Sequence, residues 1–64
     1  GETMIYTLEV HDDHAWLYPI EPSALKLRRE GCDYLQVTAA NDAIAIKRAY
    51  AILTENIRLL GVSR

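Results

Sequence analysis

Alternating apolar and polar residues mark three segments of the chain as β-strands. The first two, residues 4–11 and 14–18, are separated by Asp12 and Asp13, which favour a turn. The third segment, residues 33–39, alternates in the same way. A period of two residues is typical of a strand with one buried face. The pattern therefore predicts a hairpin followed, later in the chain, by a third strand.

Residues 22–30 fit two structures. Pro22 suits the first turn of a helix, and Gly31 suits the left-handed residue that ends one, so the segment favours a short helix. Leu25 and Leu27 alternate with basic residues, which is also typical of a strand. We expect the helix, with the strand as the alternative.

Residues 43–60 contain neither proline nor glycine and predict one long helix. Asn41 or Asp42 is suited to cap its first turn, and Gly61 is suited to end it. The predicted fold is therefore α+β, in the order β-β-α-β-α, with a three-stranded sheet packed on the long C-terminal helix. If residues 22–30 are a strand, the order becomes β-β-β-β-α.

A chain of 64 residues has room for one domain. We assign residues 4–61 to that domain, residues 1–3 to a remnant of an expression vector, and residues 62–64 to a short tail. No run of about 18 apolar residues occurs, so we expect no transmembrane helix. A core this small is marginally stable, and self-association is a common way to stabilise such a domain.

Apolar residues form two rows along the predicted helix: one row that packs on the sheet and a second row beside it. A three-stranded sheet is too narrow to cover both rows, so the second row predicts a protein partner, with a homodimer as the leading case. The alternative is that the helix over residues 22–30, or the loop over residues 19–21, covers this row within the monomer. The predicted interface comprises Ile44, Arg48, Ile52, Glu55 and Leu59 on the helix, with Trp16 and Tyr18 as aromatic anchors.

Charge is unevenly distributed along the chain. Residues 1–21 carry five acidic and no basic residues, whereas all seven basic residues lie in residues 22–64. Binding of nucleic acid is the alternative function, although the net charge of −2 is unlike that of most nucleic-acid-binding domains. The residues predicted to bind phosphates in that case are Lys26, Arg28, Arg29, Lys47 and Arg48.

The chain offers little catalytic chemistry. His11 and His14 flank the predicted turn, so their side chains leave the hairpin on the same side, and a metal-binding hairpin is the second alternative function. Cys32 is the only cysteine and is predicted to be inert and buried, which fits a reducing cytoplasm. We expect no cofactor and no enzymatic activity.

These features favour a small cytoplasmic protein-interaction module with a regulatory role. Its size is typical of accessory proteins of bacteria, phages or other mobile elements. The sequence does not identify the partner.

Overall fold

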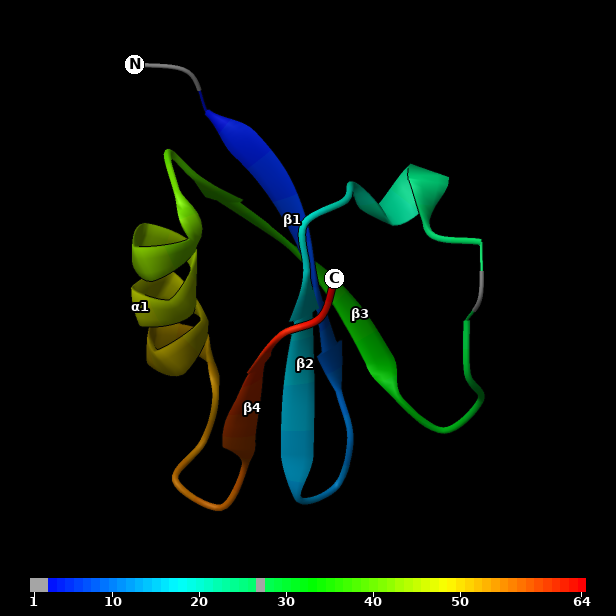
Figure 1. Ribbon diagram of the computed structural model, residues 1–64. Coiled ribbons are helices and arrows are strands. Elements are labelled where there is room, and N and C mark those ends of the chain that lie inside the picture. The colour runs from blue at the N-terminus through cyan, green and yellow to red at the C-terminus, as the bar shows by residue number, and fades with distance from the viewer. Residues whose placement is uncertain (1–2, 27) are drawn as a thin grey trace.

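The computed structural model describes residues 3–26 and 28–64; Gly1 and Glu2, assigned above to an expression remnant, and Leu27 lie outside the described residues. One helix and a four-stranded sheet confirm the α+β class (Figure 1). In chain order the elements are β1 (Met4–Val10), β2 (His14–Tyr18), the 3-10 turn η1 (Pro22–Ala24), β3 (Asp33–Ala39), α1 (Asp42–Ile52) and β4 (Arg58–Val62).

The strand order in the sheet is β3-β1-β2-β4. β1 is antiparallel to both β2 and β3, and β2 is parallel to β4. α1 connects the two outer strands, which therefore run in the same direction on opposite edges of the sheet (Figure 1). The predicted hairpin is confirmed, because the His11 N–H donates to His14 O at 2.8 Å across the Asp12-Asp13 turn.

The apolar core lies between α1 and one face of the sheet. Asn41 caps the helix as predicted, since its Oδ1 accepts a hydrogen bond from the Ile44 N–H at 3.0 Å. Tyr6 is fully buried and its hydroxyl donates to Asp42 Oδ1 at 2.6 Å, which holds the start of the helix on β1. The buried apolar residues are Tyr6, Leu8, Ala15, Leu17, Val37, Ala39, Ala45, Ala49 and Leu59.

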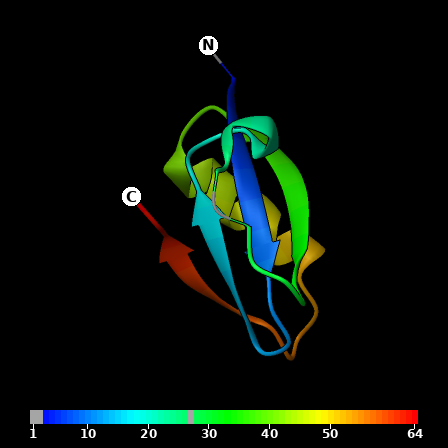
Figure 2. The same ribbon diagram turned by 90° about the vertical axis from the view of Figure 1, so that its right-hand side faces the viewer.

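A loop covers part of the other face of the sheet. In Figure 2, η1 lies in front of the strands and α1 lies behind them. Thr7 and Glu9 point away from the helix, yet both are buried, at 0% and 2% exposure. The Thr7 hydroxyl donates to Ile20 O at 2.7 Å, which attaches the start of this loop to β1. The sheet therefore has an apolar interior face and a polar face that is partly covered.

The predicted long helix over residues 43–60 is wrong in its second half. α1 ends at Ile52, and Leu53 takes an extended conformation while its N–H donates to Ala49 O. A turn follows, in which the Ile57 N–H donates to Thr54 O at 3.1 Å. The rest of the segment is β4, which pairs with β2 and buries Leu59. Pairing with a distant strand outweighs the helix propensity of this segment.

The described residues of the segment 22–30, which are 22–26 and 28–30, form neither the predicted helix nor the alternative strand. Among them only the turn η1 is regular. The backbone N–H of Arg29 donates to the Tyr34 hydroxyl at 2.6 Å instead of to a carbonyl one helical turn earlier.

Among the described residues, no helix is long and apolar enough to cross a membrane. β4 continues through Val62, and the Ser63 N–H donates to Leu17 O, so the strand reaches residues that were predicted to be tail.

Candidate functional site

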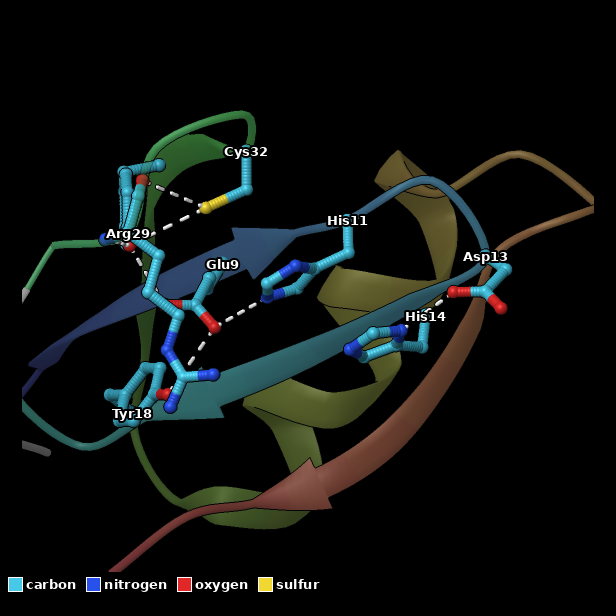
Figure 3. Close-up of polar contacts among 8 residues, drawn as sticks. Glu9, His11, Asp13, His14, Tyr18, Arg29 and Cys32 are labelled. Atoms are coloured by element: carbon cyan, nitrogen blue, oxygen red, sulfur yellow. Dashed lines mark hydrogen bonds and ion pairs between the residues drawn. The ribbon is translucent and has the colours of Figure 1, made fainter.

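A buried carboxylate lies at the centre of a polar cluster on the face of the sheet away from α1. Glu9 is 2% exposed, and side chains from β1, β2, β3 and the loop before β3 surround it (Figure 3). We call Glu9, His11, Tyr18, Cys32 and Tyr34 the Glu9 cluster. Among the described residues, no buried side-chain nitrogen or oxygen lacks a hydrogen-bond partner, so the burial of this charge is compensated.

Both carboxylate oxygens of Glu9 accept hydrogen bonds. His11 Nε2 donates to Oε1 at 2.6 Å, and the Tyr18 hydroxyl lies 3.4 Å from the same oxygen. The Tyr34 hydroxyl donates to Oε2 at 2.8 Å. The side chain of Arg29 extends over the carboxylate toward Tyr18 (Figure 3). The carboxylate is therefore held from three sides by donors and by a nearby positive charge.

These contacts set the pKa values within the cluster. Burial by itself raises the pKa of Glu9, but hydrogen bonds from His11 and Tyr34 and the charges of His11 and Arg29 outweigh it, so the net pKa lies below its ordinary value. Burial is also the largest cause that raises the pKa of Tyr34 to about 12, and the hydrogen bonds with Cys32 and Glu9 add to it. Burial and the adjacent Glu9 charge raise the pKa of Tyr18.

The cysteine joins this cluster from the loop before β3. Cys32 Sγ lies 3.3 Å from Arg29 O and 3.5 Å from the Tyr34 hydroxyl. Gly31 precedes it with a φ of 80°, a left-handed conformation that favours glycine and turns the chain toward β3. Cys32, which was predicted to be buried, is half-buried.

The two histidines at the hairpin turn adopt the predicted relationship. The rings of His11 and His14 stack with centroids 4.3 Å apart and planes 8° from parallel. His14 Nδ1 lies 2.7 Å from Asp13 Oδ1, and this hydrogen bond is the main cause that lowers the pKa of Asp13. Because the lone pair of an imidazole nitrogen lies in the plane of the ring, two parallel rings do not converge on one metal ion. The predicted pair is therefore brought together, but not as two ligands of a common ion.

A second feature is an apolar groove on the side of the sheet that carries α1. It has a volume of about 260 Å³ and lies between β3 and the chain that follows the helix. Leu35 on β3 and Ile52 at the end of α1 are 39% and 48% exposed, which is unusual for such large apolar side chains. The groove is lined by Val10, Asp33, Tyr34, Leu35, Ile52, Leu53, Thr54 and Ile57.

The residues predicted as an interface do not form one surface. Of the helical set, Ile52 lines the groove, Ile44 is half-buried against the core, and the Arg48 guanidinium donates to Thr38 O at 2.5 Å. The prediction that these residues form one row on a helix is wrong, because Glu55 lies in the turn after α1 and Leu59 is a core residue of β4. The predicted aromatic anchors, Trp16 and Tyr18, are half-buried on β2, on the face away from the helix.

The basic residues of the alternative nucleic-acid prediction lie in two groups. Lys47 and Arg48 are on α1. Lys26, Arg28 and Arg29 are in the loop on the other face of the sheet, where Arg28 stacks over the Tyr34 ring at 5.2 Å from the ring centroid. Because the two groups lie on opposite faces, they do not combine into one basic surface for a phosphate backbone.

Three important residues of these sites were not identified from the sequence. Glu9 and Tyr34 occupy polar positions of alternating strands, and such positions are exposed by default. Leu35 stands on the apolar side of its strand, a position that is buried by default. The only local signal was the two-residue spacing of Glu9 and His11, which places both side chains on one face of the predicted strand over residues 4–11.

Comparisons with protein-family models, with curated proteins and with solved structures found no match.

Proposed function

We propose that this protein is a small protein-interaction module that pairs with a second copy of itself along the outer edge of β3. The single observation that supports this most strongly is the apolar groove beside that edge, with Leu35 and Ile52 exposed on its two sides. Antiparallel pairing of two β3 strands is isologous, so each copy contributes the same edge and the same groove. A domain of this size also gains stability from association, because its own core is small.

The two edges of the sheet differ in how open they are to pairing. β3 has seven residues, contains no proline, and carries Asp33 as its only charged residue. One of its carbonyls, Thr38 O, already accepts a hydrogen bond from the Arg48 guanidinium. β4 has five residues, begins with Arg58, and has an irregular register opposite Ala15 and Trp16. Short length, charge and bulges are the features that protect an edge strand from pairing. β3 is therefore the edge that favours a partner strand.

Side chains beside β3 extend this contact beyond the backbone. Tyr50 is 56% exposed, and it lines a second hollow that shares Leu53, Thr54 and Ile57 with the groove. The two hollows are therefore continuous along the chain that follows α1. Burying this apolar surface against a second copy adds the hydrophobic component that edge pairing alone lacks.

A matched pair of variants tests this proposal. Ile52 and Leu60 are 48% and 46% exposed, but only Ile52 lines the groove. We expect wild-type protein to sediment as a dimer at high micromolar concentration, Ile52→Lys to sediment as a monomer, and Leu60→Lys to remain a dimer. A wild-type monomer across the whole concentration range contradicts the proposal, as does a dimer that both variants preserve. Far-UV circular dichroism verifies that each variant is folded.

We further infer that the module acts by occupying the surface of a partner and serves a regulatory role in a reducing compartment such as the cytoplasm. The single cysteine supports the compartment. The groove is apolar, which favours contact with a protein surface over contact with nucleic acid.

A further inference from the structure

Three side chains with different donor atoms meet on the face of the sheet away from α1. The carboxylate of Glu9, an imidazole nitrogen of His11 and the thiol of Cys32 all lie within 4.8 Å of one another. β1 supplies the first residue, the hairpin turn supplies the second, and the loop before β3 supplies the third (Figure 3). The pairing of β1 with β3 brings Cys32 to this position, although it is more than 20 residues from Glu9 in the chain.

We propose that Glu9, His11 and Cys32 bind a zinc ion through Oε1, Nε2 and Sγ, with water as the fourth ligand. Carboxylate oxygen, imidazole nitrogen and thiolate sulfur are the three ligand types that zinc uses in proteins. Magnesium and calcium select sites made of oxygen atoms alone, so this mixed set discriminates against them. The carboxylate and the thiolate together balance the charge of a divalent ion at a site where Glu9 is 2% exposed. The Arg29 side chain, which extends over the carboxylate, therefore has to turn toward solvent when the ion binds.

The required rearrangement is small. Zinc binds these donors at about 2.0–2.3 Å, so tetrahedral ligand atoms stand roughly 3.3–3.7 Å apart. His11 Nε2 and Glu9 Oε1 are 2.6 Å apart and have to separate by roughly 1 Å. Cys32 Sγ lies within 4.8 Å of the other two ligand atoms and has to approach them by roughly 1 Å. Binding replaces the hydrogen bond between His11 and Glu9 with two bonds to the ion. The proton that His11 Nε2 donated either moves to Nδ1 by exchange with water or, from a protonated imidazole, is released to solvent, and the thiol proton is released as well.

Neighbouring groups hold the ligands in place. The Tyr34 hydroxyl donates to Glu9 Oε2 at 2.8 Å, which leaves Oε1 directed toward His11. The ring of His14 stacks on His11 at 4.3 Å and restricts its rotation. Contacts of this kind, made by residues that do not touch the ion, are a regular part of metal sites in proteins. His11 and Cys32 are half-buried, so the fourth position of the ion faces solvent.

The two histidines have different roles here, whereas the metal-binding hairpin predicted from the sequence would use both as ligands. In this proposal His11 is a ligand, whereas His14 supports its ring and does not bind the ion. A bound ion joins the loop before β3 to β1, so it connects two parts of the polar face that are otherwise held by hydrogen bonds. The proposal is independent of self-association through β3, since its ligands do not line the groove.

Cobalt(II) titration followed by optical absorption tests the site, because tetrahedral cobalt with a thiolate ligand gives intense visible bands and a near-ultraviolet charge-transfer band. We expect both in the wild-type protein, and competition by zinc should abolish them. Cys32→Ser should remove the charge-transfer band and weaken zinc binding by more than about 100-fold, which exceeds the usual effect of removing a supporting residue. His11→Asn should weaken binding similarly. His14→Asn removes only the ring that supports His11, so it should keep the tetrahedral spectrum at saturating cobalt and weaken binding by less than His11→Asn does.

Several results overturn the proposal. Absence of zinc binding at micromolar concentrations in the wild-type protein does so directly. A pale spectrum without the charge-transfer band indicates an octahedral site without the thiolate and also overturns it. Loss of binding in His14→Asn together with normal binding in Cys32→Ser assigns the metal to the hairpin histidines instead. Circular dichroism of each metal-free variant separates loss of ligands from loss of the fold, and Cys32→Ser, at a half-buried position, is the variant that best preserves it.

Discussion

Tyr34 lies directly opposite Glu9 in the register of β1 and β3, and its hydroxyl donates a 2.8 Å hydrogen bond to the buried carboxylate. The same hydroxyl accepts a hydrogen bond from the Arg29 N–H at 2.6 Å. One phenol therefore links β1, β3 and the loop that precedes β3. Hydrogen bonds of this hydroxyl therefore hold the polar face of the sheet together, whereas apolar packing holds the opposite face.

Removing that hydroxyl should destabilise the protein. Tyr34→Phe leaves a buried carboxylate oxygen without its donor, and we expect the free energy of unfolding to fall by about 1–3 kcal/mol. Urea denaturation in the presence of a chelator measures this change. Tyr50→Phe is the matched control, because Tyr50 is 56% exposed on α1, and its stability should equal that of the wild type. Equal stability of Tyr34→Phe and wild type is the contrary result.

Stability should fall in acid because of Glu9. Its pKa is lower in the folded protein than its ordinary value of 4.5, so the unfolded chain takes up a proton first as the pH falls. The contribution of ionised Glu9 is fully present above that ordinary value and is lost as the pH drops through the folded value. Urea unfolding of metal-free protein between about pH 2 and 6 should show a shallower pH dependence for Glu9→Gln. Glu21→Gln, in the exposed loop before η1, is the control and should retain the wild-type slope.

At alkaline pH, stability should fall as the pH rises, because of Tyr34. Tyr34 has a folded pKa of about 12 against an ordinary value of 10, so its neutral form is favoured by folding. The corresponding stability is present below pH 10 and is lost as the pH rises toward 12. Spectrophotometric titration of the phenols should show a larger late-titrating component in the wild type than in Tyr34→Phe, in which Tyr18 still has a raised pKa. Late components of equal size in the two proteins disprove the assignment.

β4 can be tested with two adjacent leucines. Leu59 is 6% exposed in the core and Leu60 is 46% exposed, whereas the predicted continuous helix placed Leu59 on its outward row. Leu59→Ala should lower the free energy of unfolding by about 2–5 kcal/mol, through lost burial and a cavity. Leu60→Ala should cost less than about 1 kcal/mol. Similar losses for both variants, measured by urea denaturation, would indicate that residues 58–62 are not a strand packed as described.

The strands and turns that depend on local pattern were predictable from the sequence. Alternation identified β1, β2 and β3, and residue type and position identified Asn41 as one of two candidates for the helix cap. β4 was not identified, because its apolar sequence without proline fits a helix equally well. Only the parallel pairing with β2 distinguishes the two. Local sequence carries no information on a pairing that links residues more than 40 positions apart.

The candidate sites were predictable only in part. The stacked histidines follow from a two-residue turn, which is a local feature. Glu9 and Cys32 come together only through the register of β1 with β3 and the path of the intervening loop. Ile52 was identified as an exposed apolar residue, but the groove that it lines exists because the helix ends there and the chain turns back toward β4.

Amide hydrogen exchange at several protein concentrations tests pairing along β3 most directly, because it compares the two edges of the sheet within one molecule. Exchange would be followed by two-dimensional NMR from low to high micromolar concentration. We predict that amides of β3 that face away from β1 become protected as concentration rises, while those at the outer edge of β4 do not. Protection that is independent of concentration on β3, or that increases on β4 instead, contradicts the account.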